Sequence, residues 1–469
     1  MSMVGLLVFT ESHDREDAFR NRIKFLQEEL IVLHNELQGL VEVFTPNPGL
    51  IRDKRDLRQA VCEIQKQVDI GCCILYIGTF VNASDVAMAV RLINLPCILL
   101  GNKNTNTVSC VGFLAAAGAI TQAGLSVKRI DGDIRDQAIQ KQISSFCAAA
   151  NAKKLLSGET FGMIGGRALG ISTGTADSAQ WMKEFGIDIT HIDQLEIVTR
   201  AKNATQDKIK QFRNWIFQRY GQVNFQANRF EEEHLEKMIR SYLAVKSMIK
   251  DYGLDFAGIK CQPEMSNGFV LQCLTVQLLN DRYDAEGPKK PFVCSCEADA
   301  DGALTMEIMK HISGNKPTSL QDVFCFEEKR IMVLANCGAG ASYFAGYSSN
   351  EEENLKQVFL QPHGFGTAGG ASCQFNYAPG INTLARLTRK NMKYRMLITR
   401  GLVQKRCRKD LEKYSWYRPT SVMEMEIDNE TLSHKLESNH LLTLEGDYVK
   451  ELEEFCILNS IEFDTLIDN

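Results

Sequence analysis

The chain lacks long hydrophobic runs and a strong charge of either sign. Among its 469 residues no segment approaches about 20 continuous apolar residues, so no membrane-spanning helix is expected. The formal net charge of −5 is small for this length, and no run of Lys and Arg is interleaved with aromatic residues. Both features argue against a nucleic-acid-binding surface. The first residues, MSMVGLLVFTESHDRED, have no basic region before their short apolar run and predict a strand instead of a signal peptide.

Cysteine pairs with the spacing of metal or redox motifs are also missing. None of the 15 cysteines stands in a CxxC pair, and several lie in apolar runs, where they behave as small buried hydrophobic residues: Cys72, Cys73, Cys97, Cys294 and Cys296. An odd number of cysteines without framework spacing indicates a reducing compartment and argues against disulfides or structural zinc. We therefore expect a cytoplasmic protein.

The order of apolar runs divides the chain into three parts. Over residues 1–157 short apolar runs alternate with amphipathic stretches, which predicts a doubly wound, flavodoxin-like parallel sheet. Residues 158–340 alternate in the same way and contain a glycine turn at Gly165–Gly166. Residues 341–469 are rich in Gly, Ser and aromatic residues with β-like alternation. The predicted fold is therefore α/β, with two doubly wound parallel-sheet domains followed by a β-rich C-terminal domain with a closing helix.

The most informative stretch is PFVCSCEADADGALTMEIMK, residues 291–310. Phe292–Cys296 predicts a buried strand that ends at Glu297, after which apolar residues resume at helical spacing. The acidic residues between these elements lie at the carboxyl end of a strand, where open α/β sheets bind ligands. Asp299 and Asp301 precede the helix, so their ordinary role is to cap it and complement its dipole.

Two carboxylates of this region form a candidate metal and proton-transfer site. Glu297 follows its strand directly, and Asp322 comes 25 residues later, before the apolar run Ile331–Ala335. We assign that run to the same α/β domain. Two carboxylates on adjacent strand ends can hold a hard divalent cation and move protons.

Three other segments contain candidate ligands or substrate contacts. His440 follows Ser438 and Asn439, but a lone histidine is more often structural than a ligand. Gln262 lies at the carboxyl end of another predicted strand, where loop capping and ligand contact are equally compatible with the pattern. Arg167 follows the glycine turn between apolar neighbours and could contact an anion or a sugar.

Two further motif matches are weak. HGFGTAGG, residues 363–370, imitates a dinucleotide loop without strand–helix context, so we expect turns in a β region. His363 could contact a substrate, but we expect it in a surface turn. Cys337 lies at a strand end without a basic partner nearby in the sequence, which makes it a poor nucleophile. No HExxH, P-loop or kinase motif set is present.

Five segments together resemble the L-fucose isomerase/L-arabinose isomerase family. They are GGRALGISTGTADSAQWMKEFGIDITHIDQLEIVTRA (165–201), DFAGIKCQPE (255–264), CEADADGALTMEIMK (296–310), LANCG (334–338) and SNHLLTLEGD (438–447). The similarity is clear over about residues 158–340 and the C-terminal segment of about 35 residues, and it is weak in the first domain and over residues 341–428. The resemblance implies two α/β domains, a β-rich C-terminal domain and a homo-oligomer, trimeric or hexameric.

The resemblance also implies interconversion of aldoses and ketoses with a bound Mn²⁺, for which Mg²⁺ or Co²⁺ could substitute. The metal ligands of fucose-isomerase-like members match Glu297, Asp322 and His440. Gln262 matches a substrate contact, and Arg167 and Asn439 are further candidates. Moving a carbonyl from C1 to C2 requires removal of a weakly acidic proton. A Lewis-acidic cation stabilises the enediolate oxygens, while the two carboxylates, the candidate catalytic residues, accept and return the proton.

Three functions remain open at this point. The first is a metal-dependent aldose–ketose isomerase acting on a hexose or a deoxy or modified hexose. Sulfoquinovose is a specific alternative substrate, with Arg15, Arg167 and Lys260 as candidates to contact its anionic group. The second is a non-catalytic sugar-binding relative. The third, a dinucleotide oxidoreductase, rests only on the glycine-rich segment and the first α/β domain. We expect a small-molecule sugar partner, with neither nucleic acid nor membrane.

Overall fold

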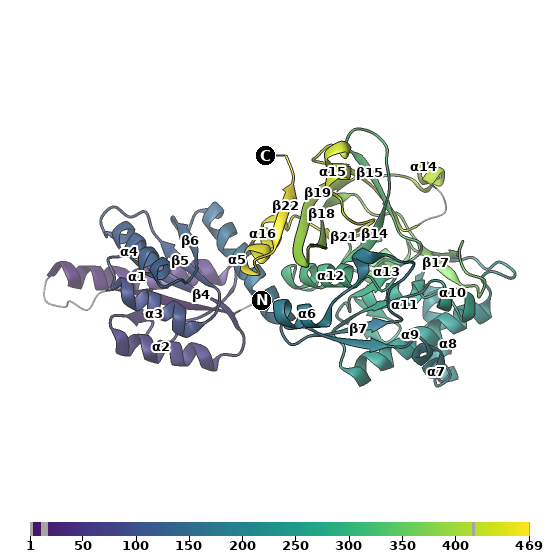
Figure 1. The fold of residues 1–469 in the computed structure, drawn as a ribbon, viewed down its shortest axis with the longest axis horizontal. Helices are drawn as coiled ribbons and strands as arrows, with labels where there is room; N and C mark the ends of the chain where they lie inside the picture. Colours follow the sequence, from purple (N-terminus) through teal and green to yellow (C-terminus); the bar gives the residue numbers. More distant parts are fainter. Residues whose placement is uncertain (1–2, 11–16, 415–417, 469) are drawn as a thin grey trace. The chain divides into compact units, whose positions relative to one another are not determined.

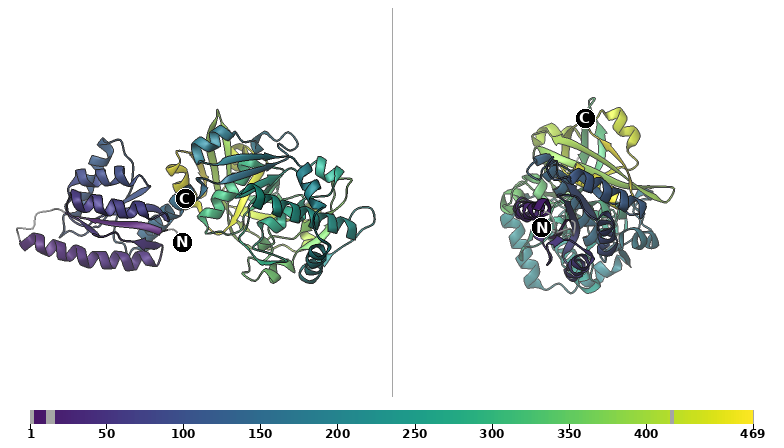
Figure 2. Two further views of the ribbon diagram at one scale, coloured as in Figure 1. Left: turned by 90° about the horizontal axis from the view of Figure 1, so that it is seen from below. Right: turned by 90° about the vertical axis from the view of Figure 1, so that its left-hand side faces the viewer.

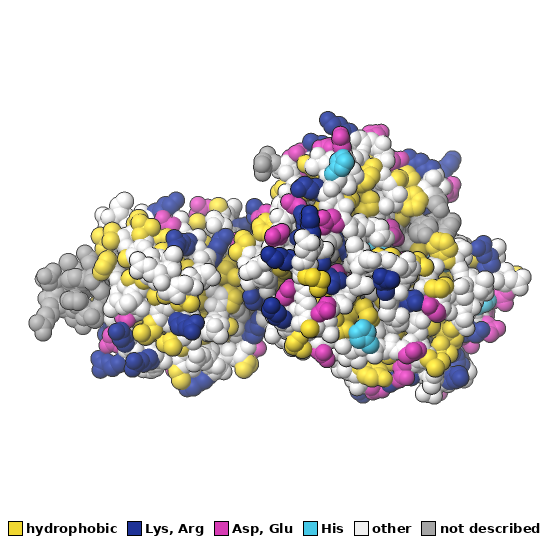
Figure 3. Space-filling view, in the orientation of Figure 1, with side chains coloured by type: hydrophobic (Ala, Val, Ile, Leu, Met, Phe, Trp, Pro, Cys, Tyr) yellow, Lys and Arg dark blue, Asp and Glu magenta, His cyan; other side chains and the backbone are white. Residues whose placement is uncertain are grey.

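The structure is a computed structural model that describes residues 3–10, 17–414 and 418–468. It divides into two compact units, Met1–Lys154 and Leu155–Asn469, which we describe separately (Figure 1). None of the helices within the described ranges is long and apolar enough to cross a membrane. On the face drawn in Figure 3, Lys and Arg side chains are interspersed with Asp and Glu side chains on each unit.

The first unit is built on a parallel sheet with the strand order β2-β1-β4-β5-β6. β4 is buried at all eight of its positions, as expected for a central strand that is covered on both faces. The strands are β1 (Met3–Phe9), β2 (Glu42–Phe44), β4 (Ile70–Ile77), β5 (Cys97–Gly101) and β6 (Lys128–Asp131), and the short β3 (Leu50–Ile51) also pairs with β1.

Helices cover both faces of this sheet (Figure 2). On one face α1 (Asp17–Gln38) and α5 (Gln137–Leu156) pack near Cys72 and Tyr76 of β4: the sulfur of Cys72 lies 3.6 Å from that of Cys147, and the Tyr76 hydroxyl donates to Glu29 at 2.6 Å. On the other face Cys73, Leu75 and Ile77 share a core with α2 (Lys54–Lys66), α3 (Ala83–Ile93) and α4 (Ser109–Gln122). The predicted doubly wound, flavodoxin-like sheet is confirmed.

The second unit begins with another parallel sheet, in the order β13-β10-β7-β8. Its strands are β7 (Thr160–Ile164), β8 (Asp188–Ile192), β10 (Phe256–Ile259) and β13 (Cys294–Cys296). The chain between and beside these strands forms α6 (Ser178–Phe185), α7 (Leu195–Ala201), α8 (Gln206–Arg219), α9 (Glu232–Tyr252), α10 (Glu264–Gly268) and α11 (Cys273–Asn280). The predicted second α/β region is therefore present.

The rest of the second unit contains a closed β-barrel. Its strands follow the order β18-β21-β14-β15-β20-β19, and the ring closes because β18 also pairs with β19. All pairs of the ring are antiparallel, and β22 is added to β19 in parallel. The strands are β14 (Ser319–Phe326), β15 (Ile331–Ala335), β18 (Gly380–Lys390), β19 (Lys393–Val403), β20 (Thr420–Met425), β21 (His440–Glu445) and β22 (Glu462–Leu466).

The barrel corrects one element of the sequence analysis. Ile331–Ala335, which we assigned to the second α/β domain, is β15 of the barrel, and Asp322 lies within β14 and not at the end of a strand of the parallel sheet. An apolar run has the same appearance in a parallel and in an antiparallel strand, so the pattern could not identify its partner. The division at residues 157 and 340 stays a prediction.

Smaller elements complete the second unit. β16 (Phe359–Pro362) and β17 (Ala371–Gln374) form an antiparallel pair, and the loop 363–370 joins them. Gly366, Gly369 and Gly370 of this loop have positive φ, so the predicted turns are confirmed. Further elements are β9 (Gln222–Val223), β11 (Tyr283–Asp284), β12 (Gly287–Pro288), α13 (Glu351–Leu355), α14 (Arg408–Leu411), α15 (Asn429–Lys435) and α16 (Val449–Leu458).

Helix α12 (Ala300–Ile312) connects the parallel sheet with the barrel. It contacts β10 and β13 of the parallel sheet as well as β18 and β21 of the barrel. Figure 1 shows α12 next to β18 and β21. All of its residues except His311 are buried, and the Thr305 hydroxyl accepts a hydrogen bond from the Leu387 amide of β18 at 3.1 Å. The turn that precedes α12 therefore lies where the carboxyl end of β13 meets the barrel strands.

Candidate functional site

The turn between β13 and α12 has an unusual backbone. Glu297 and Ala298 have φ values of 60° and 51°, a left-handed conformation that residues with a side chain rarely adopt. The amide of Ala298 donates to the Ile259 carbonyl at 3.1 Å, which holds the turn against β10. Gly258 makes this approach possible, because a Cβ there would lie 2.9 Å from Cα of Ala298. Such strain persists where the surroundings enforce it, and it clusters at functional sites.

The three predicted metal ligands lie together, with Glu297 and Asp322 both beside His440, which is fully buried. Its Nε2 lies 3.5 Å from an oxygen of Glu297 and 3.4 Å from an oxygen of Asp322. Asp322 is the register partner of His440 across β14 and β21, so the barrel, and not the parallel sheet, brings these two residues together. The side chains of Glu297 and Asp322 are 14% and 26% exposed and therefore face the solvent side of the cluster.

Asp299 contacts the other side of the same imidazole. It caps α12 as predicted, accepting a hydrogen bond from the Gly302 amide at 2.8 Å. One of its oxygens also lies 2.6 Å from Nδ1 of His440. A carboxylate can only accept here, so Nδ1 carries the hydrogen, and Nε2 faces the two carboxylates, where it can bind either a proton or a metal ion.

Arg386 of β18 completes this buried network. Its guanidinium donates to both oxygens of Asp299, at 2.5 and 3.1 Å, and to the Thr173 carbonyl at 2.6 Å. Both side chains are about 1% exposed. Burial alone would raise the pKa of Asp299, but Arg386 and His440 hold it well below its usual range. Asp299 therefore remains an anion that orients His440.

The donor set fits a hard divalent cation. The buried Nε2 of His440 has no hydrogen-bond partner within the described residues, and two carboxylates flank it. Burial would lower the pKa of His440, but Asp299, Asp322 and Glu297 raise it well above the usual value. The cluster thus attracts positive charge at Nε2, where a cation can replace the proton. A histidine held by a carboxylate through its other nitrogen is the common arrangement of metal-bound histidines.

A small enclosed pocket adjoins Glu297. Gln262, Glu297 and His363 line it together with several apolar and sulfur-containing side chains. His363 is only 3% exposed, so its expected place in a surface turn was wrong: the loop 363–370 folds back, and its Ala368 amide donates to the Ser266 carbonyl at 3.0 Å. Burial lowers the pKa of His363 to about 4, which leaves a neutral imidazole at neutral pH.

The predicted substrate contacts differ in their surroundings. Gln262 is half-buried in the pocket, and the exposed Asn439 donates to Asp322 at 3.0 Å. Arg167 is exposed beyond the carboxyl end of β7, whereas Lys260 pairs with Glu264 at 2.6 Å. Arg15 lies outside the described residues.

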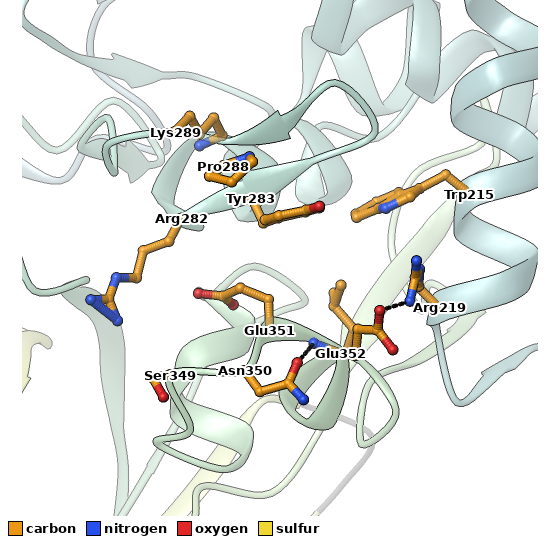
Figure 4. A pocket seen from close by; sticks show the side chains of 11 residues that line it. Trp215, Arg219, Arg282, Tyr283, Pro288, Lys289, Ser349, Asn350, Glu351 and Glu352 are labelled. Atoms are coloured by element: carbon orange, nitrogen blue, oxygen red, sulfur yellow. Dashed lines mark hydrogen bonds and ion pairs between the residues drawn. The ribbon is translucent and has the colours of Figure 1, made fainter.

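A larger cavity, of about 390 Å³, lies beyond the other end of α11. Figure 4 shows Trp215 and Tyr283 reaching into it on one side and Glu351 and Glu352 of α13 on the other. Glu352 is paired with Arg219. We place the candidate active site at the smaller pocket, because Glu297, which lines it, belongs both to the strained turn and to the carboxylate–imidazole cluster.

A serine motif near the site does not form a nucleophile turn. Gly170–Gly174 (GISTG) fits the GxSxG pattern, which requires a sharp strand-to-helix turn around the serine. Ser172 instead begins the 3₁₀ helix η1 (Ser172–Gly174). The structure therefore does not favour serine hydrolase chemistry at this position.

The second unit, with its parallel sheet, its closed barrel and the carboxylate–imidazole cluster between these two, defines a class of α/β proteins with a barrel at the C-terminal side. Within that class, residues 334–466 match the family model of the L-fucose isomerase C-terminal domain. This match includes residues 341–428, where the motifs alone indicated weak similarity. It places the barrel strands from β18 to β22 within that domain.

Three relatives named as sugar isomerases resemble the chain. It is 24% identical to a sulfoquinovose isomerase of Alkalicoccus urumqiensis over 58% of this chain and 57% of that protein. A sulfoquinovose isomerase of Clostridium sp. (strain MSTE9) is 23% identical over 69% of this chain and 70% of that protein. An L-fucose isomerase of Citrobacter koseri is 22% identical over 47% of this chain and 42% of that protein. The chain spans little more than half of the first relative, and the predicted resemblance to the fucose-isomerase-like family is confirmed.

Proposed function

We propose that the protein is a metal-dependent aldose–ketose isomerase, an intramolecular oxidoreductase that acts on a hexose or a modified hexose. The observation that carries this proposal is the convergence of Glu297 and Asp322 on Nε2 of His440, with Nδ1 anchored by Asp299. The names of the relatives support the same reaction class. Two carboxylates beside a cation site are the groups needed to move a proton between neighbouring carbons.

Glu297, Asp322 and His440 would hold the metal, for which we propose Mn²⁺, with Mg²⁺ or Co²⁺ as substitutes. When bound, the cation supplies Lewis-acid stabilisation of the negative charge that develops on the sugar oxygens. Glu297 and Asp322 accept the proton from one carbon and return it to the next. His440 stays fixed, because Asp299 and the buried Arg386 hold its ring. Asn439 donates to Asp322 and keeps that carboxylate in place.

For the substrate we propose sulfoquinovose as the leading candidate among modified hexoses. The first relatives are named sulfoquinovose isomerases. Arg167 supports an anionic substrate, because β7 is parallel to β10 and β10 to β13, which puts the segment after β7 and Glu297 at the same edge of the sheet. Gln262 at that edge is a candidate for contact with sugar hydroxyls.

Two competing functions, a dinucleotide oxidoreductase and a non-catalytic sugar-binding protein, fit the structure less well. The dinucleotide reading is not supported, because the loop 363–370 joins two antiparallel strands and does not lead from a strand into a helix. A non-catalytic sugar-binding relative would not need two carboxylates around a buried imidazole. A homo-oligomer and a cytoplasmic location stay predictions. All 15 cysteines are free in the structure, as the prediction of a reducing compartment requires.

Proton NMR in D₂O tests the proposed function. The protein is loaded with Mn²⁺ and given a panel of aldoses that includes sulfoquinovose, glucose and fucose. We expect ketose formation with deuterium at C2 of the re-formed aldose, greatest for sulfoquinovose. Binding of a sugar without any isomerisation in the panel would favour the non-catalytic reading. Sedimentation at micromolar concentration tests the oligomer, which an active monomer would contradict.

A further inference from the structure

A second set of donor atoms surrounds the carboxylate of Glu297. Cys296, the last residue of β13, and Cys337, just after β15, place their sulfurs within 4.8 Å of each other and of a Glu297 oxygen. The thiol of Cys337 also interacts with that of Cys273 at the start of α11. All three cysteines are buried, and they line the pocket next to Glu297.

The backbone around these thiols is fixed by the fold. Asn336 accepts hydrogen bonds from the amides of Gly338 and Ala339, at 3.0 and 2.7 Å, which holds the turn after β15. A Cβ at Gly338 would lie 2.9 Å from the sulfur of Cys273, so only glycine at this position lets α11 bring that thiol close. The three thiols come from separate elements and are held in place before any ligand binds.

The spacing suits a soft cation. Zinc–sulfur bonds of about 2.3 Å in a tetrahedral site put neighbouring sulfurs about 3.8 Å apart, so donor atoms within 4.8 Å need only small movements. Thiolates select Zn²⁺ and similar soft cations, whereas carboxylates and imidazole suit Mn²⁺ and Mg²⁺. The two donor sets therefore differ in the metals that they prefer and have Glu297 in common.

We propose that Cys296, Cys337 and Glu297 form a binding site for a thiophilic divalent cation such as Zn²⁺ or Cd²⁺, beside the thiol of Cys273. As each sulfur–metal bond forms, the thiol loses its proton to solvent, and no electron is transferred. Where the proposed isomerase function holds, occupation of this site withdraws Glu297 from Asp322 and His440. Thiophilic cations then inhibit the enzyme in competition with Mn²⁺.

Cadmium titration of the metal-free, full-length protein tests this site without reference to activity. We expect a thiolate-to-cadmium absorption band in the ultraviolet that saturates at one equivalent. C296A and C337A should each reduce the band at least about 10-fold at low Cd²⁺, since each removes one of the required ligands. The matched control is C147A, which removes one thiol of the buried pair Cys72–Cys147, 3.6 Å apart, and should keep the band.

Two results would overturn the proposal. One is the absence of a band in the wild-type protein, and the other is a band that survives C337A but is lost in C147A. X-ray absorption of the cadmium-loaded wild-type protein avoids any effect of the variants on folding. At least two sulfur neighbours support the site, and a shell of oxygen and nitrogen alone contradicts it. Neither measurement requires isomerase activity, so this site and the proposed function can fail independently.

Discussion

Asp299→Asn removes one negative charge from the buried contact between His440 and Arg386 while keeping the size of the side chain. If Asp299 only capped α12, its loss would cost about 1 kcal/mol of stability. The structure predicts a larger loss of stability, because the Arg386 guanidinium, which is about 1% exposed, would lose its carboxylate partner. Breaking a buried ion pair costs about 3–5 kcal/mol. Asparagine still accepts one hydrogen bond, so we expect the free energy of unfolding to fall by about 3 kcal/mol, the lower end of this range.

The same substitution should weaken metal binding. Removing the carboxylate that orients a metal-bound histidine costs about 10- to 100-fold in metal affinity. The affinity for Mn²⁺ can be measured by electron paramagnetic resonance of the free ion, and the free energy of unfolding by urea denaturation. Arg386→Lys should act in the same direction, because lysine cannot form the two parallel hydrogen bonds to Asp299.

Asp301→Asn is the matched control, two residues further along. Asp301 is also buried; its oxygens lie 3.2 Å from Nε of Arg389 and 3.0 Å from the Tyr394 hydroxyl, which donates to it. Burial raises the pKa of Asp301 to about 7, so asparagine resembles a form that is already populated at neutral pH. We expect a smaller loss of stability and unchanged Mn²⁺ affinity. Equal Mn²⁺ affinities in the wild-type protein and Asp299→Asn would refute the role given to Asp299.

Three further predictions concern catalysis, packing and pH. Glu297→Gln should lower kcat by about 10²–10⁴-fold and weaken Mn²⁺ binding while the protein stays folded by circular dichroism; near-normal turnover would contradict it. Gly302→Ala should destabilise by about 1–3 kcal/mol in urea, because its Cβ would lie 2.7 Å from Cγ of Asp299 and 2.8 Å from Nη1 of Arg386; unchanged stability would count against this close approach. His311 Nε2 lies 2.8 Å from Glu159 and 3.1 Å from Glu307; burial lowers its pKa, but these carboxylates raise it to about 9. The protonated His311 therefore contributes its full stabilisation below pH 6.5, and this contribution is lost as the pH rises through about 9. The free energy of unfolding, measured at several pH values, should show this loss in the wild-type protein and not in His311→Gln.

The parallel sheets and the acidic turn were predictable from local patterns. The run Phe292–Cys296 followed by Glu297 predicts a strand with a carboxylate at its end, and the structure has β13 and a strained turn there. The pairing of Asp322 with Glu297 was predicted from adjacent strand ends, but that reason was wrong, because Asp322 lies within β14 of the barrel. The addition of His440 came from the family resemblance. Spacing alone could not supply it, because His440 and Asp322 meet across the barrel strands β14 and β21.

The contact of Asp299 with Arg386 could not be predicted from the sequence. Its position before a helix already accounts for an aspartate, so nothing local indicates a further partner. Arg386 lies 87 residues away in a strand without a motif, and its burial depends on the packing of α12 against β18. The available signal was a charged residue between the apolar neighbours Ala385 and Leu387, and it does not identify the partner.

The most direct test of the proposed function is isomerisation before and after removal of metal in the same sample. The protein is stripped of metal with a chelator, given sulfoquinovose in D₂O, followed by proton NMR and then supplied with Mn²⁺. The account predicts no ketose before the addition and ketose with deuterium incorporation after it, with no such recovery in Glu297→Gln. Full turnover by the metal-free protein would contradict a metal site formed by Glu297, Asp322 and His440.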